Sequence, residues 1–171
     1  LVEPCGAAVT VRDPVLAPPA ADSAERRDAA RLLASAAGEP GHGPRIGIHL
    51  GAHYGPAKLL PIERVAELCR LLAADGATAI LLGAPADVEL GAGVTAMAPA
   101  ASLVGRDSPT LLPAVLAELD VLVSGETGVA HLAAALGTPV VALFGGADPA
   151  LSAPRGRGAV LAGPAPWAPC G

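Results

Sequence analysis

The sequence is poor in the side chains with which proteins hold nucleic acids. Aromatic residues make up 2% of its 171 residues, and Lys and Arg number 11 against 16 Asp and Glu, which leaves a net charge of −5. Non-specific binding to nucleic acids depends on neutralising many phosphates, and binding to single strands depends on aromatic rings that stack with bases. We therefore expect no nucleic-acid partner.

Long hydrophobic runs are also missing, although apolar residues make up 52% of the chain. The longest candidate, residues 129–144, is interrupted by His131, Gly137, Thr138 and Pro139. A membrane-spanning helix needs about 18 or more predominantly apolar residues. The composition therefore predicts a chain without a membrane span, of a length that suits one domain with its own core.

The three cysteines, Cys5, Cys69 and Cys170, are far apart and form no CxxC pair. This spacing indicates neither a zinc site nor a disulfide framework, and we expect no metal. Cys69 falls within an apolar helical pattern and is expected to be a small buried hydrophobic residue. Free cysteines fit a reducing compartment, so we expect a cytoplasmic protein.

A stretch rich in proline and alanine, residues 1–21, and one rich in glycine and proline, residues 38–44, flank one predicted helix. Asp22 and Glu25 have the spacing of a capping box, and the helix is expected to run to about Ala37. We interpret residues 1–44 as an interdomain linker with one helix, and residues 45–171 as one domain. The chain opens without Met or a signal peptide and ends without a closing helix, so we expect it to be part of a longer protein.

From residue 45 onward, short apolar strands alternate with helical patterns. Strands are predicted over 45–50, 78–82, 102–104, 121–123, 139–144 and 159–161, and helices over 62–74, after Pro85, over 111–119 and over 128–136. This alternation predicts an α/β fold in which about six parallel strands form an open, doubly wound, Rossmann-like sheet.

Ligands of such sheets bind beyond the carboxyl ends of the strands. The rule selects the loops that follow the strands, and glycines and unusual polar residues gather in them: residues 51–58, 83–89, 105–108, 124–128 and 145–149. We expect the functional site in these loops.

Residues 124–131 combine a strand end, a tight glycine turn and a helix start. The first N–H groups of a helix lack internal partners, and with the helix dipole they favour an anion such as a phosphate. Thr127 could cap the helix and contact the phosphate, whereas Glu126 would repel it and suits sugar hydroxyls. His131 lies one turn along the helix on the same side as Thr127. A capped helix with a structural histidine would explain the same pattern.

The loop over residues 51–58 carries Lys58 after a glycine-rich stretch. A lysine in such a loop can act as a point charge on a phosphate. His53 and Tyr54 could add hydrogen-bond donors. The alternative is a solvated surface lysine, which is the ordinary state of a lysine.

The loops after the second and third strands offer Asp87, Glu89, Arg106 and Asp107. A carboxylate after the second strand of a nucleotide-binding sheet often binds ribose hydroxyls, although Asp87 could equally be a solvated residue near a helix N-terminus. The sequence contains no GxGxxG, GxxxxGK[ST] or GxSxG motif, which argues against a dinucleotide fingerprint, a P-loop and a hydrolase nucleophile elbow.

Together these segments resemble glycosyltransferase family 9, the ADP-heptose:lipopolysaccharide heptosyltransferases. The segments that carry the resemblance are His49-Leu50-Gly51-Ala52, Gly55-Pro56-Ala57-Lys58, Leu103-Val104-Gly105-Arg106, Glu126 to Gly145, and Ala147-Asp148-Pro149. The run from Thr127 to Gly145 is long and specific, and the resemblance covers residues 45–154. It implies the GT-B arrangement of two facing Rossmann-like domains, and this chain resembles the C-terminal, donor-binding half.

The resemblance implies roles at the donor's phosphates and sugar. Lys58 would contact the diphosphate, and Thr127 and Gly128 would present the helix N-terminus to it. His131 would lie near the sugar or the phosphate. The implied reaction is an inverting, metal-independent transfer from an ADP-heptose-like donor to a glycolipid acceptor in lipopolysaccharide core or related glycan synthesis.

The resemblance also implies contacts to the nucleoside part of the donor. Asp87 or Glu89 would face the ribose, and Arg106 and Asp107 would flank the base. The family's general base is an aspartate of the other domain, so we expect no catalytic base in this chain and no sugar transfer by the chain alone.

Two further observations keep other functions open. Glu126 stands where the family usually has aspartate, commonly after asparagine where this chain has Gly125, and this departure favours a non-catalytic nucleotide-binding module. The weak signals for contacts to the base leave open another GT-B enzyme, such as a nucleotide-sugar epimerase. We expect the protein in the cytoplasm, free or peripheral at the inner face of the cytoplasmic membrane.

Overall fold

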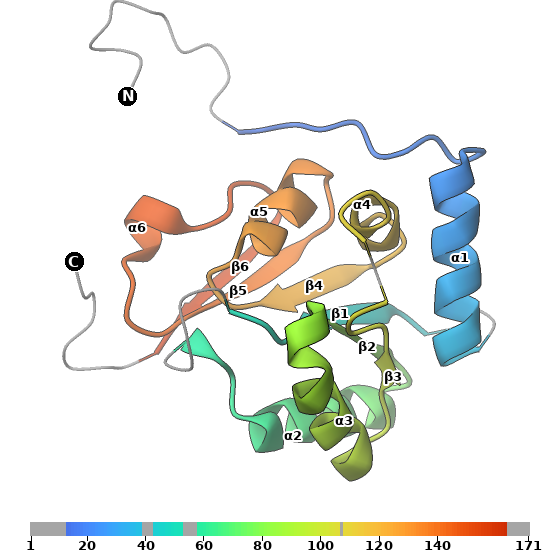
Figure 1. Cartoon of the computed structure of the whole chain (residues 1–171). Coiled ribbons are helices and arrows are strands. Elements are labelled where there is room, and N and C mark those ends of the chain that lie inside the picture. Colours follow the sequence, from blue (N-terminus) through green and yellow to red (C-terminus); the bar gives the residue numbers. More distant parts are fainter. Residues whose placement is uncertain (1–12, 39–42, 53–57, 107, 164–171) are drawn as a thin grey trace, which may run out of the picture.

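Six parallel strands form a single twisted sheet in the computed structural model, which describes residues 13–38, 43–52, 58–106 and 108–163. The strands are β1 (Arg45–His49), β2 (Thr78–Leu82), β3 (Ala101–Ser102), β4 (Val121–Ser124), β5 (Val140–Phe144) and β6 (Gly158–Ala162). Their order is β3-β2-β1-β4-β5-β6, so the chain reverses its direction of winding between β1 and β4 (Figure 1). This is the doubly wound order predicted from the sequence.

Helices cover both faces of this sheet (Figure 1). They are α1 (Ala24–Ala37), α2 (Ile62–Ala74), α3 (Val88–Met97), α4 (Leu112–Leu116), α5 (Gly128–Ala135) and α6 (Pro149–Ser152), with a 3₁₀ turn, η3, over Pro85–Asp87. Side chains alternate along a strand, so Ile80 and Leu82 pack into the core with α1, α4 and α5, while Ala79 and Leu81 pack with α2 and α3. The continuous apolar run of β2 is explained by this burial on both faces.

Helix α1 is part of the core rather than a bare connection. Its N-cap is Ser23, whose Oγ accepts a hydrogen bond from the Arg26 N–H at 3.2 Å, one residue later than the predicted cap. Ala29 and Leu33 are completely buried against the sheet and α4. Arg26 adds an ion pair with Glu118 at 2.9 Å. The assignment of residues 1–44 to an interdomain linker stays a prediction, but its helix packs on the domain.

Most predicted elements are confirmed, with differences at the third strand and in the helices. Strand β3 ends at Ser102, yet its pairing continues as single hydrogen bonds from Leu103 N–H to Leu81 O and from Gly105 N–H to Gly83 O, both 2.9 Å. The short helix expected after Pro85 continues as α3 to Met97. Helix α6 was not predicted from the sequence.

Two further expectations concern membranes and thiols. Within the part of the chain that the structure describes, no helix is both long and apolar enough to cross a membrane. Cys69 is a free, fully buried thiol on α2, and burial raises its pKa, as expected of a small hydrophobic side chain.

We predict that Leu33→Ala lowers the free energy of unfolding by about 2–5 kcal/mol, because it leaves a cavity between α1 and the sheet. Urea denaturation of both proteins measures this difference. Leu71→Ala is the matched control: Leu71 is 61% exposed on α2, and its loss should change stability by less than about 0.5 kcal/mol. Equal effects of the two substitutions would show that α1 is not part of the cooperative core.

Candidate functional site

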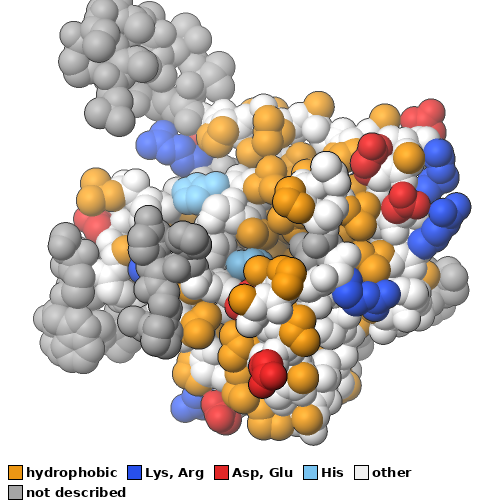
Figure 2. All heavy atoms as spheres, in the orientation of Figure 1, with side chains coloured by type: hydrophobic (Ala, Val, Ile, Leu, Met, Phe, Trp, Pro, Cys, Tyr) orange, Lys and Arg blue, Asp and Glu red, His pale blue; other side chains and the backbone are white. Residues whose placement is uncertain are grey.

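The main pocket lies where the winding of the sheet reverses. It has a volume of about 610 Å³ and is lined by residues from the ends of β1 and β4, from η3, and from α4 and α5. His49, the last residue of β1, is paired with Leu82 of β2 and Ser124 of β4, so the loops that follow these three strands surround the pocket. In Figure 2, apolar side chains gather round a hollow in the middle of this face. Ligands of doubly wound sheets bind in this position.

The N-terminus of α5 forms one wall of the pocket through Thr127, Gly128 and Val129. Thr127 has the extended backbone of an N-cap residue, but its hydroxyl is hydrogen-bonded to Ser124 Oγ at 2.9 Å and does not cap the helix, contrary to the cap expected from the sequence. A Cβ on Gly128 would meet no atom of the described residues within 4 Å, so these residues leave the helix start open to a ligand. The backbone N–H groups at this point favour an anion.

Lys58 and Glu126 join the loops after β1 and β4. The Lys58 Nζ lies 2.8 Å from Glu126 Oε2, and the side chains are 37% and 9% exposed, respectively. Because Glu126 directly precedes Thr127, the lysine and the helix start lie on the same edge of the sheet, as predicted. A smaller pocket of about 160 Å³ lies beside this pair and is also lined by Phe144 and Gly145 at the end of β5.

Asp87 closes the opposite wall of the main pocket. Its Oδ2 accepts a hydrogen bond from the Ala84 N–H at 2.8 Å. The carboxylate lies against the backbone of buried Gly51, where a Cβ would come within 2.3 Å of Asp87 Oδ2. Gly51 therefore has to be a glycine if Asp87 is to keep this position.

His49 lies on the floor of the same pocket and was not predicted as a site residue. Its Nδ1 is buried and has no hydrogen-bond partner among the residues that the structure describes. Burial lowers the pKa of its imidazole, and the charge of Asp87 and the Gly51 backbone oppose this shift. A polar residue at the end of an apolar strand was the signal that could have indicated it.

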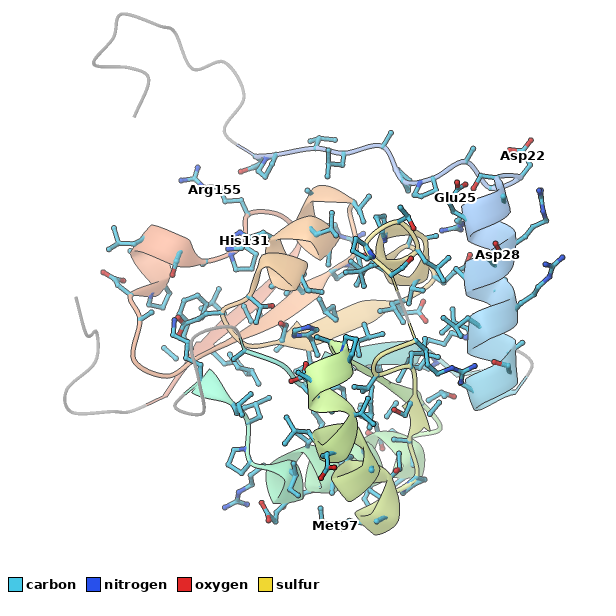
Figure 3. All side chains as sticks on the ribbon, in the orientation of Figure 1. Asp22, Glu25, Asp28, Met97, His131 and Arg155 are labelled. Atoms are coloured by element: carbon cyan, nitrogen blue, oxygen red, sulfur yellow. The ribbon has the colours of Figure 1, made fainter. Side chains whose placement is uncertain are left out.

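Three other predicted residues that the structure describes, Glu89, Arg106 and His131, do not line the main pocket. Glu89 is exposed on α3, and Arg106 donates a hydrogen bond to Ser35 Oγ of α1 at 3.1 Å. His131 is exposed and projects from the outer side of α5 (Figure 3). His53, Tyr54 and Asp107 lie outside the described residues, so their contacts stay predictions.

A metal site is not formed by the described residues. No group of three or more His, Cys, Asp or Glu side chains gathers in that part of the chain in a way that could hold a metal ion. The independence from metals expected from the sequence stays a prediction.

Known proteins are similar to this chain in sequence. The profile of glycosyltransferase family 9 (heptosyltransferase) matches residues 8–168. Lipopolysaccharide heptosyltransferase 2 of Escherichia coli is 33% identical over 117 residues, which cover 65% of this chain and 34% of that protein. The match thus spans about a third of the length of this curated relative.

Solved structures share the fold. A family 9 glycosyltransferase from Veillonella parvula superposes with a TM-score of 0.81 over 95% of this chain and 46% of its own, at 22% identity. Escherichia coli heptosyltransferase WaaC with ADP gives a TM-score of 0.62 over 80% of this chain and 42% of its own, at 29% identity.

We predict that acid destabilises the protein partly through His49. Because burial lowers the imidazole pKa in the folded state, the stability contributed by the neutral ring is present above the unfolded value of about 6.5 and is lost as the pH falls through the folded pKa. The free energy of unfolding, from urea titrations between about pH 7.5 and 5, should fall more steeply for the wild type than for His49→Gln. Replacement of exposed His131 by Gln is the matched control, and parallel curves for wild type and His49→Gln would contradict the prediction.

Proposed function

Because the chain belongs to glycosyltransferase family 9, we propose that it forms the half of such an enzyme that binds the nucleotide-sugar donor, with ADP-heptose as the donor. The proposal rests on one observation. The α5 N-terminus, the Lys58–Glu126 pair and Asp87 lie together at the carboxyl ends of the strands, where the winding of the sheet reverses. The structure of Escherichia coli WaaC with ADP supports the nucleotide, and the name of the Escherichia coli relative supports a lipopolysaccharide acceptor.

The diphosphate would bind at the start of α5. Open backbone N–H groups at Gly128 and the helix dipole supply positive potential, and Lys58 supplies a full charge nearby. Glu126 would repel a phosphate if it stood alone. With Lys58 at 2.8 Å, the cation can lie between the carboxylate and the phosphate and interact favourably with both.

The sugar would lie beside Glu126, next to the smaller pocket at the ends of β4 and β5. A carboxylate accepts hydrogen bonds from hydroxyl groups, and this one is 9% exposed and held in place by Lys58. Glu126 thus acts on the part of the donor that differs between one nucleotide sugar and another. It would influence which sugar is accepted.

The nucleoside would occupy the main pocket, whose 610 Å³ is typical of small-molecule sites. Asp87 would accept hydrogen bonds from the ribose hydroxyls. Leu112, Val129 and Leu132 give this pocket an apolar wall on α4 and α5, against which a base can pack. The base would therefore be held largely by burial.

In the reaction, a hydroxyl of the acceptor would attack the anomeric carbon of the sugar and the nucleoside diphosphate would leave. This chain would stabilise the negative charge of the leaving group through α5 and Lys58. The proton of the acceptor hydroxyl would pass to a base outside this chain. A lipid-linked acceptor would bring the enzyme to the inner face of the cytoplasmic membrane.

We predict that Lys58→Ala weakens the binding of ADP by about 1–3 kcal/mol, the range for losing a hydrogen bond to a charged group. Isothermal titration calorimetry measures the change. Arg64→Ala is the matched control, because it removes an exposed cation that is paired with Glu67 at 2.9 Å on α2, away from the pocket. If the two variants bind ADP equally well, Lys58 has no part in phosphate binding.

Glu126→Gln should change the affinity for ADP and the affinity for ADP-heptose in different ways. The neutral side chain no longer competes for Lys58, so ADP should bind as well as before or more tightly. ADP-heptose should bind more weakly, because the carboxylate contact to the sugar hydroxyls is lost. Titration with both ligands measures the two affinities, with Glu67→Gln as control, and equal losses for both ligands would mean that Glu126 only supports the loop.

A further inference from the structure

His49 occupies the position between the two polar walls of the main pocket. Strand β1 lies between β2 and β4, and His49 pairs with the last residue of each. Asp87 follows β2 and the start of α5 follows β4, so the imidazole lies between a carboxylate and an anion-binding helix start. All three features line the same pocket.

The hydrogen-bonding state of this ring follows from its burial. A neutral imidazole has one N–H donor and one bare acceptor nitrogen. Its Nδ1 is buried without a partner among the described residues, whereas the ring as a whole is only partly buried and its remaining surface lines the pocket. An unpaired buried donor is the rarer and costlier arrangement. The tautomer that leaves Nδ1 bare places the proton on Nε2, on a ring that also interacts with the Asp87 carboxylate and the Gly51 backbone.

We propose that His49 is a binding residue for the nucleotide, and that its Nε2–H donates a hydrogen bond where the ribose meets the first phosphate. The proposal rests on the proposed function, because it takes the donor's ribose to lie at Asp87 and its phosphates at the α5 N-terminus. The atoms that join those two groups must cross the position of His49. Burial lowers the pKa of the ring and keeps it neutral at pH 7, so it acts as a directional donor rather than as a charge.

Three substitutions separate the functions of the ring. His49→Phe keeps a planar ring and removes both nitrogens. His49→Gln can place an amide nitrogen where Nε2 lies, and His49→Asn can place one only where Nδ1 lies. The affinities of the wild type and each variant for adenosine, AMP and ADP are measured by titration calorimetry, with thermal unfolding as a check on folding.

The expected result is a loss of about ten-fold or more in the affinity of His49→Phe for AMP and ADP, the size of a lost hydrogen bond to a charged group, with adenosine within about two-fold of wild type. His49→Gln should recover most of the loss and His49→Asn should not. If His49→Phe does not fold, the comparison of Gln with Asn carries the test by itself.

Three results would overturn the inference. They are wild-type affinity of His49→Phe for ADP, an equal loss for adenosine, AMP and ADP, and better recovery by Asn than by Gln. The wild type reports separately on the proposed function: if it does not bind ADP, the donor-binding proposal fails first. If the wild type binds ADP and the His49 variants bind it with the same affinity, only the role assigned to His49 is rejected.

Discussion

The pairing of β1 with β2 on one side and with β4 on the other determines where the pocket and its loops lie in this domain. All strands run parallel, so every strand ends at the same edge of the sheet, and the chain winds away from β1 in opposite directions. The loops after β1 and β4 cannot be covered by a crossover helix at this point, since the helices that leave them pack on opposite faces. A hollow therefore remains between them, and the polar residues that end these strands face it.

Two carboxylates lie at this edge of the sheet although the proposed ligand is an anion: Asp87 lines the main pocket and Glu126 the smaller one beside it. Asp87 is stabilised by the Ala84 N–H, and Glu126 by Lys58. The backbone at the start of α5 adds positive potential without a side chain. In the function we propose, these carboxylates would bind hydroxyl groups, while the helix start and Lys58 would offset their repulsion of the phosphates.

Much of the fold followed from the sequence, because apolar strand runs and helical periodicity act locally. Lys58 and Thr127 were placed on one edge by the rule that parallel strands share a carboxyl end. The ion pair between Lys58 and Glu126 could not be predicted, since it depends on the path of a loop through space. His49 was overlooked for a similar reason: only the packing of neighbouring strands buries its Nδ1. The contact of Arg106 with Ser35 depends on how α1 packs, which no local pattern specifies.

The packing of α1 sets a condition on exchanging this domain between relatives. Leu33 and Ala29 fill space on the sheet that no other part of the described chain occupies, and Arg26 ties the same helix to Glu118. A chimera joined at residue 45 would combine the sheet of one protein with the helix of another and leave their contact surfaces mismatched. The unit to transplant therefore begins ahead of Ser23, so that the helix and the surface it covers come from the same parent.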